Sequence, residues 1–147
     1  GKGLSKYLIH TGKMLSANEA KEIGLVDKII THEEMFSLLE GKAPIPKSLK
    51  GKLSLKWQSI ANLFENNSLA EIINKKCSDN ILSKEEIDKI ARAINSKAPI
   101  ALRLADKLIS EEQGCRSELQ HLREVFSTSD ALLGLTSIGK KVVYEGK

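Results

Sequence analysis

Three short fragments carry residue types that serine enzymes use for nucleophilic catalysis. Ser137 and Lys140 have the Ser-x-x-Lys spacing, in which a lysine one helical turn away can activate the serine hydroxyl. Residues 78–80 read Ser-Asp-Asn, and residues 10–12 read His-Thr-Gly where such enzymes carry Lys-Thr-Gly. The fragments run in the reverse of the required order, and the chain is short for such an enzyme. We therefore expect no serine nucleophile.

Two stretches combine glycine and lysine, the residue types that hold phosphate groups. Residues 1–6 read Gly-Lys-Gly-Leu-Ser-Lys, but they lack the glycine spacing and the preceding strand of a phosphate-binding loop. Residues 41–56 contain five lysines and no acidic residue, with two prolines and Gly51 as interruptions. This stretch could bind phosphate, but like charges in a turn-rich segment more often face water, so we predict an exposed loop.

The cysteines and histidines do not form a metal-ligand pattern. Cys77 and Cys115 lie far apart, without a Cys-x-x-Cys pair or a histidine at ligand spacing, so we expect reduced thiols and neither a zinc site nor a disulfide. His10 lies where a predicted helix ends, His32 beside a predicted helix start and His121 within a helix, so we expect structural or surface roles for all three. Paired-carboxylate catalysis is not predicted either, because no such pair lies beside a glycine-rich turn.

The composition is typical of a globular protein. The 147 residues are 41% hydrophobic and 29% charged with a formal net charge of +4, which excludes disordered and fibrous classes and favours contact with anions. No apolar run approaches the ~18 residues of a membrane-spanning helix, and we find no signal-peptide pattern, so we expect a cytoplasmic protein without membrane contact. Aromatic residues are 4% of the chain and scattered singly, which argues against nucleic-acid binding.

Apolar residues recur every three or four positions along most of the chain, which predicts a mostly α-helical fold. Helix starts are marked by capping boxes, in which a hydroxyl and a carboxylate three residues later satisfy backbone N–H groups. The pairs are Ser16 with Glu19, Thr31 with Glu34, and Ser83 with Glu86. Gly24 is predicted to end the first of these helices, and Pro99 to begin another.

One short strand is predicted among these helices, because residues 25–30 place Leu25, Val26, Ile29 and Ile30 after a glycine. A single strand leaves its edges unpaired, so this run implies pairing with a further segment or with a second copy. Further helices, each with an apolar stripe, are predicted in residues 53–64, 69–73, 87–94, 100–109, 119–126 and 132–138. The first two are expected to pack, and the stripe of the third is expected to face inward.

Residues 1–30 contain a series of motifs that a known family carries with the same spacing. The motifs are Gly1-Lys2, His10-Thr11-Gly12, Ser16-Ala17-Asn18-Glu19-Ala20 and Gly24-Leu25-Val26-Asp27. The series resembles the enoyl-CoA hydratase/isomerase (crotonase) family, which carries Gly-Lys, Leu-Thr-Gly, Ser-Ala-x-Glu-Ala and Gly-Leu-Val-Asp. His10 departs from the leucine that is usual in the family.

The C-terminal part resembles the same family. Residues 97–107 are similar to its Lys-x-Pro-x-Ala-Leu helix, and residues 126–141 are similar to its Phe-x-Thr-x-Asp…Gly…Lys-Arg ending. Leu133 stands where a glutamate usually precedes the glycine, and the tail is two residues short. Residues 137–146 are also similar to proteins in which the hydratase follows a 3-hydroxyacyl-CoA dehydrogenase on one polypeptide. The resemblance covers residues 1–38 and 84–147.

The resemblance implies the C-terminal helical portion of a crotonase-like (ClpP/crotonase) fold, mostly α with at most one or two short strands. It implies a parent enzyme that hydrates trans-2-enoyl-CoA in fatty-acid β-oxidation, with two glutamates as the reacting groups. Two backbone amides form the oxyanion hole that stabilises the enolate oxygen. In the family these groups precede the segment that matches residue 1, so we assign no catalytic residue and expect this chain alone to be inactive.

The family's C-terminal helices build an oligomer interface and offer a phenylalanine and a lysine to the adenosine-phosphate end of CoA. Phe126 and Lys140 match these positions, with Lys141 as the substitute in a shifted register. Packing of Phe126 into a helical core is the alternative. We expect acyl-CoA as the substrate of the parent, no cofactor or metal in this chain, and self-association through apolar helix faces.

The expected organisation is one fragment in three segments. Core-edge helices and a strand occupy residues 1–38, a lysine-rich loop and helices occupy 39–83, and an oligomerisation and CoA-side segment occupies 84–147. Two alternatives stay open: a free-standing helical interaction module, and another crotonase-family reaction on acyl-CoA, either isomerisation or thioester hydrolysis.

Overall fold

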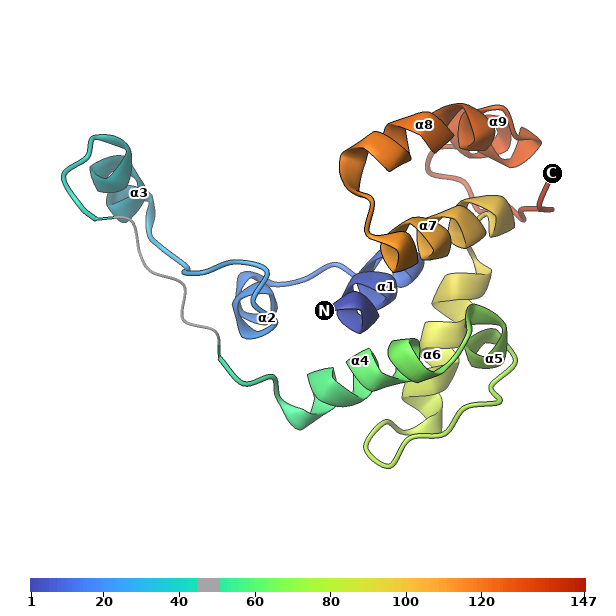
Figure 1. Ribbon diagram of the computed structural model, residues 1–147, viewed down its shortest axis with the longest axis horizontal. Helices are drawn as coiled ribbons and strands as arrows, with labels where there is room; N and C mark the ends of the chain where they lie inside the picture. The colour runs from blue at the N-terminus through green and yellow to red at the C-terminus, as the bar shows by residue number, and fades with distance from the viewer. Residues whose placement is uncertain (45–50) are drawn as a thin grey trace. The chain divides into compact units, whose positions relative to one another are not determined.

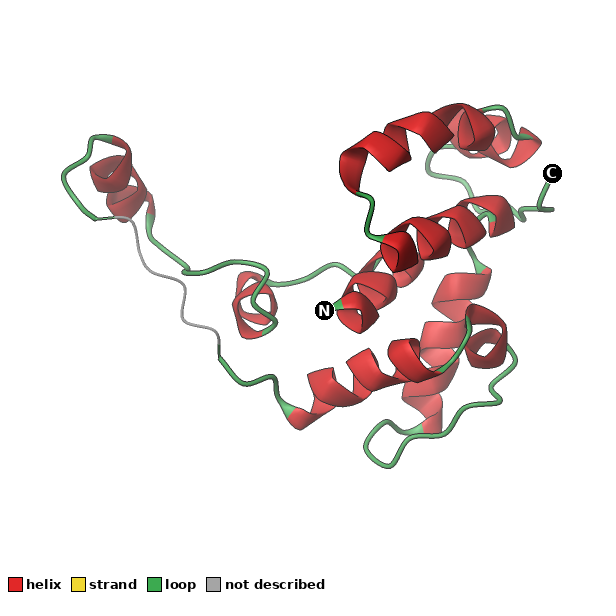
Figure 2. Ribbon diagram, viewed as in Figure 1, coloured by secondary structure: helices red, strands yellow, loops and turns green. Residues whose placement is uncertain are grey.

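The computed structural model describes residues 1–44 and 51–147, which form helices and loops without strands (Figures 1 and 2). The helices are α1 (Lys2–Thr11), α2 (Ala17–Glu22), α3 (His32–Leu39), α4 (Leu55–Asn66), α5 (Leu69–Ile73), α6 (Lys84–Asn95), α7 (Pro99–Glu111), α8 (Gly114–Phe126) and α9 (Ser129–Thr136). The prediction of a mostly α-helical fold is confirmed.

The chain forms two compact units. The first comprises Gly1–Lys13 and Ser59–Lys147, and the second comprises Met14–Gln58. α1, most of α4 and α5 to α9 belong to the first unit, whereas α2 and α3 belong to the second. The three segments expected from the sequence rest on resemblance rather than on contacts, and they stay a prediction.

The capping boxes at the starts of α2, α3 and α6 are confirmed. In each, the side-chain oxygen at the cap accepts a hydrogen bond from the backbone N–H three residues on, and the glutamate there accepts one from the N–H of the cap. Ser68 and Glu71 form a fourth capping box at α5, which the sequence analysis missed. Pro99 begins α7 as predicted.

The strand predicted at residues 25–30 is wrong, since this stretch is turn and loop. Gly24, at φ 73°, turns the chain at the end of α2. The N–H groups of Leu25 and Val26 then donate to the carbonyl of Ala20, at 2.8 and 3.3 Å. The backbone groups that a sheet would use are therefore engaged by the end of the helix, and no described segment pairs with them.

The lysine-rich stretch is described only in part. Residues 41–44 and 51–54 are non-helical and mostly exposed, as predicted, and α4 begins at Leu55. Lys47 and Lys50 lie outside the described residues, so the prediction for them is untested.

The core of the first unit is built around α6. α6 contacts α5 and α1, and α1 in turn contacts α7. The side chains predicted to face inward from α6, those of Ile87, Ile90, Ala91 and Ile94, are all buried. They share the buried core with Leu4, Ile60, Leu63, Phe64, Ile72, Leu82, Leu102 and Leu104. The 3.6-residue period therefore located the core face of α6 correctly.

α1 and α4 approach each other closely at Gly3. A Cβ atom at this position would overlap the carbonyl oxygen of Ala61 and lie 2.8 Å from its carbonyl carbon. The backbone N–H of Gly3 also donates to Glu65 Oε1 at 3.1 Å. This carboxylate satisfies one of the N–H groups that the first turn of a helix leaves without an intrahelical partner.

Most side chains of the predicted apolar stripes in α8 and α9 are exposed, whereas Val125 and Leu133 are half-buried. Six side chains of the stripes are exposed: Leu119, Leu122, Phe126, Leu132, Leu135 and Ile138. The reason lies in the neighbours, because α8 contacts α7 and α9 but no third layer of described residues covers it. The chain end is anchored, since the Asp130 carboxylate accepts hydrogen bonds from the N–H groups of Glu145 and Gly146, at 2.9 and 2.8 Å.

Candidate functional site

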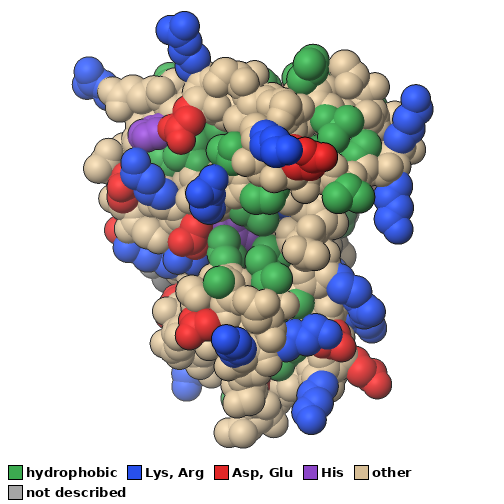
Figure 3. All heavy atoms as spheres, turned by 90° about the vertical axis from the view of Figure 1, so that its right-hand side faces the viewer, with side chains coloured by type: hydrophobic (Ala, Val, Ile, Leu, Met, Phe, Trp, Pro, Cys, Tyr) green, Lys and Arg blue, Asp and Glu red, His purple; other side chains and the backbone are tan. Residues whose placement is uncertain are grey.

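A cavity of about 510 Å³ opens in the first unit. It is bounded by the end of α1, the turn between α6 and α7, and the facing surfaces of α7, α8 and α9. Its wall is mainly apolar, and α7 contributes two alanines to it, Ala101 and Ala105, one turn apart. Figure 3 shows one face of the molecule, on which hydrophobic side chains gather centrally and Lys and Arg side chains project at the margin. The volume lies in the range of small-molecule sites.

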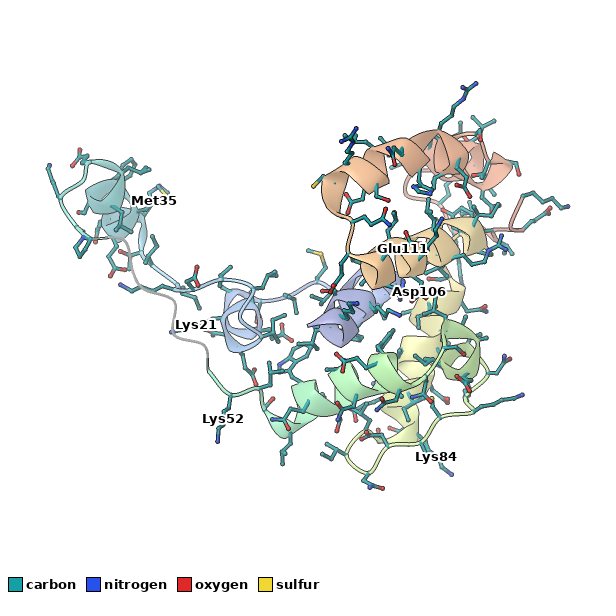
Figure 4. The ribbon with its side chains drawn as sticks, viewed as in Figure 1. Lys21, Met35, Lys52, Lys84, Asp106 and Glu111 are labelled. Atoms are coloured by element: carbon teal, nitrogen blue, oxygen red, sulfur yellow. The ribbon has the colours of Figure 1, made fainter. Side chains whose placement is uncertain are left out.

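His10 is the unusual polar residue of the wall, because it is fully buried and neither ring nitrogen has a hydrogen-bond partner. Its Nε2 lies 3.9 Å from Oδ1 of Asp106, which is too far for a hydrogen bond. Asp106, labelled on α7 in Figure 4, instead pairs with the Lys6 ammonium at 2.9 Å. The ring stacks on Phe64, with 6.3 Å between the centroids.

Burial keeps this imidazole neutral. The loss of solvation lowers the pKa of His10 below its ordinary value of 6.5; the nearby charge of Asp106 acts in the opposite direction, and that of Lys6 adds to the lowering. A neutral imidazole carries one N–H donor and one nitrogen acceptor, and here both lack partners. A buried polar group without a partner reduces stability and calls for an explanation.

We predict that His10→Leu raises stability and removes a pH dependence. The unfolded chain binds a proton at His10 near pH 6.5, whereas the folded chain binds it only at lower pH. The wild type therefore loses stability as the pH falls from 7 to 5, and the leucine variant loses less. Removing the unpartnered group should raise stability by about 1 kcal/mol, or roughly 2–4 °C in Tm. Thermal melts between pH 5 and 8 measure both effects.

His32→Leu is the matched control, because His32 is exposed at the start of α3. The difference between the melting temperatures at pH 7 and pH 5 should be the same in this variant as in the wild type. If the melting temperature of the His10 variant depended on pH as strongly as that of the wild type, this buried ring would not couple folding to pH.

Lys97 is an exposed residue of the wall and its one cationic side chain among the described residues. Its ammonium lies 3.3 Å from where a Cβ of Gly12 would stand, beside the left-handed residue that ends α1. No described carboxylate forms an ion pair with Lys97. The remaining charged residue of the wall, Asp130, is already occupied by two backbone N–H groups of the chain end.

The predicted site residues are distributed unevenly around the cavity. Phe126 lies in its wall and is 62% exposed, so the alternative of core packing is wrong. Lys140 and Lys141 follow α9, are exposed, and do not line the cavity. Sequence reasoning missed the roles of His10 and Lys97 in the wall. The one available signal for His10 was that a histidine stands where the family that the sequence resembles usually has leucine.

The other candidate chemistries have local structural explanations. Ser137 and Lys140 lie in a turn after α9, where the Lys140 N–H donates to the Ser137 carbonyl at 2.9 Å. Asp79 accepts from the N–H groups of Ile81 and Leu82, which lowers the pKa of its carboxyl. Burial raises the pKa of the Cys77 thiol. Among the described residues, no three His, Cys, Asp or Glu side chains are grouped as metal ligands.

None of the described helices combines the length and the apolarity needed to cross a membrane. Comparison of the chain with protein-family models, with curated proteins and with solved structures found no match. The functional argument therefore depends on the residues and the geometry given above.

Proposed function

We propose that this chain is the C-terminal helical part of an enzyme of the enoyl-CoA hydratase (crotonase) type, with a crotonase-like fold. The parent reaction is the hydration of trans-2-enoyl-CoA in fatty-acid β-oxidation, in a protein that can also carry a 3-hydroxyacyl-CoA dehydrogenase. In this proposal the chain contributes self-association and contact with CoA, and no catalytic residue. The observation that carries it is the series of family motifs at family spacing in residues 1–30 and 97–141.

The exposed apolar side chains of α8 and α9 support a role in self-association. Leu122 of α8 is 46% exposed and Leu135 of α9 is 59% exposed, and Ile138, in the turn after α9, is 83% exposed. Monomeric proteins rarely leave a large contiguous apolar surface in water, and covering it against a second copy removes that surface from solvent. Two neighbouring helices with such side chains suit an interface between copies of this chain.

The charges near the chain end support contact with CoA. Lys140 and Lys141 are adjacent and exposed, and the chain has a net charge of +4. An exposed lysine pair attracts a phosphate group through a charge interaction that salt weakens. Phe126 offers an exposed ring against which an adenine could stack.

Reversing this lysine pair tests the proposal. We expect the double variant Lys140→Glu with Lys141→Glu to weaken CoA binding at least tenfold at low salt, and the difference should shrink as salt is added. Isothermal titration calorimetry of the full chain with CoA, from 20 to 300 mM salt, measures this.

The matched control reverses two exposed lysines of α6, Lys84 and Lys89, which changes the net charge equally. It should bind CoA like the wild type, and sedimentation of each variant reports whether self-association has changed. Equal dissociation constants for the wild type and the Lys140/Lys141 variant would contradict CoA contact, and so would an absence of CoA binding. Such a result would favour the helical interaction module instead.

A further inference from the structure

The cavity between α1, α7, α8 and α9 shows three features that need a common explanation. The first is its size, because about 510 Å³ lies open between the helices of this unit. Ala101 and Ala105 of α7 and Val125 of α8 line this space, and their short side chains leave more room than long ones would. An apolar body the size of a medium-length alkyl chain fits a cavity of this kind.

The second feature is the pair of unpartnered nitrogens of His10. Buried side-chain nitrogens in proteins are nearly always hydrogen-bonded, and this ring lies in the wall of a cavity with both nitrogens free. Asp106 does not serve as the partner, because its nearest oxygen lies 3.9 Å away and Lys6 holds it at 2.9 Å. The ring therefore has a donor for a group that enters the cavity.

The third feature is the charge of Lys97. Its ammonium lies beside the end of α1 without a described carboxylate partner. The other charged group of the wall is Asp130. Asp130 keeps its negative charge, but both of its oxygens accept backbone N–H groups. The Lys97 ammonium is therefore the charged group of the wall without a described partner, and it favours an anionic head.

We propose that this cavity binds a small amphiphilic monocarboxylate. The apolar body lies between α7, α8 and α9, while the carboxylate pairs with the Lys97 ammonium and accepts the N–H of His10. This inference goes beyond the proposed function, because the site uses neither Lys140 nor Lys141 and requires no CoA.

A homologous series of ligands tests the proposal on the full chain. Hexanoate, octanoate and decanoate are titrated by calorimetry, with octanol as the uncharged match for octanoate. The dissociation constant should fall about fourfold for each added methylene, the factor expected when a CH₂ group leaves water. Octanol should bind at least tenfold more weakly than octanoate, because it lacks the charge that pairs with Lys97.

Variants assign the binding to the cavity. Lys97→Gln should weaken the binding of octanoate at least tenfold and leave the binding of octanol unchanged. Ala101→Leu should weaken the binding of both ligands, because the larger side chain fills the space. His10→Leu should weaken the binding of octanoate several-fold. Because we expect the same variant to raise the melting temperature, loss of folding cannot account for this loss of binding. Lys89→Gln on α6 is the control for charge alone, and it should bind octanoate like the wild type.

Adsorption of the alkyl chain to the exposed residues of α8 is the competing explanation. Leu122→Glu changes that surface without changing the cavity wall, and it should leave octanoate binding intact. Equal affinity for octanoate and octanol, an unaffected Lys97→Gln variant, or loss of binding in Leu122→Glu would each overturn the proposal. The Lys140/Lys141 double variant should bind octanoate normally, so failure of the proposed CoA contact and failure of this site are distinguishable.

Discussion

Replacing Phe64 with alanine is expected to destabilise the first unit by about 3–5 kcal/mol, the usual cost of removing a buried aromatic side chain. Phe64 is 1% exposed. Its ring meets Tyr7 edge-on with 5.6 Å between centroids and stacks on His10. One side chain of α4 therefore contacts two residues of α1, and its loss leaves a void at the centre of the unit. The free energy of unfolding from urea titrations measures the effect.

Phe36→Ala is the matched control, because Phe36 is the same residue type but 53% exposed on α3. It should change the unfolding free energy by only about 0.5 kcal/mol. Similar losses in the two variants would show that Phe64 does not lie in a packed core.

Gly3→Ala is expected to lower stability by about 2–3 kcal/mol, near the upper end of overpacking costs. Within a helix the same change ordinarily raises stability by about 1 kcal/mol, so the expected sign is reversed here. The reason is that the added Cβ would lie 2.8 Å from the backbone carbon of Ala61. Backbone atoms cannot move aside as a flexible side chain can, so α1 and α4 must separate. A thermal melt should show a fall of roughly 5–10 °C.

Ser5→Ala serves as the control, because Ser5 lies in the same helix with an exposed side chain. It should melt within about 2 °C of the wild type. A Gly3→Ala variant as stable as the wild type would mean that the two helices do not approach as closely as the structure indicates.

The helix starts and the core face of α6 could be predicted because they depend on interactions between near neighbours. A capping box needs only a hydroxyl and a carboxylate three residues apart, so Ser83 with Glu86 is readable from the sequence. The inward face of α6 could be read because apolar side chains at helical spacing lie on one side. The burial of His10 could not be predicted, since a histidine near a helix end can lie either in water or in a core.

The sequence by itself determined the approximate positions of most helices, where several of them begin, and that the fold is mostly α. Tertiary structure alone decided three matters. Residues 25–30 form no strand because no described segment pairs with them. The stripes of α8 and α9 stay mostly exposed because no described element covers them. His10 and Lys97, 87 positions apart by their numbers, line one cavity because α1 contacts both α6 and α7. Local spacing sets how a segment folds, but burial, pairing and cavities depend on which distant segments meet.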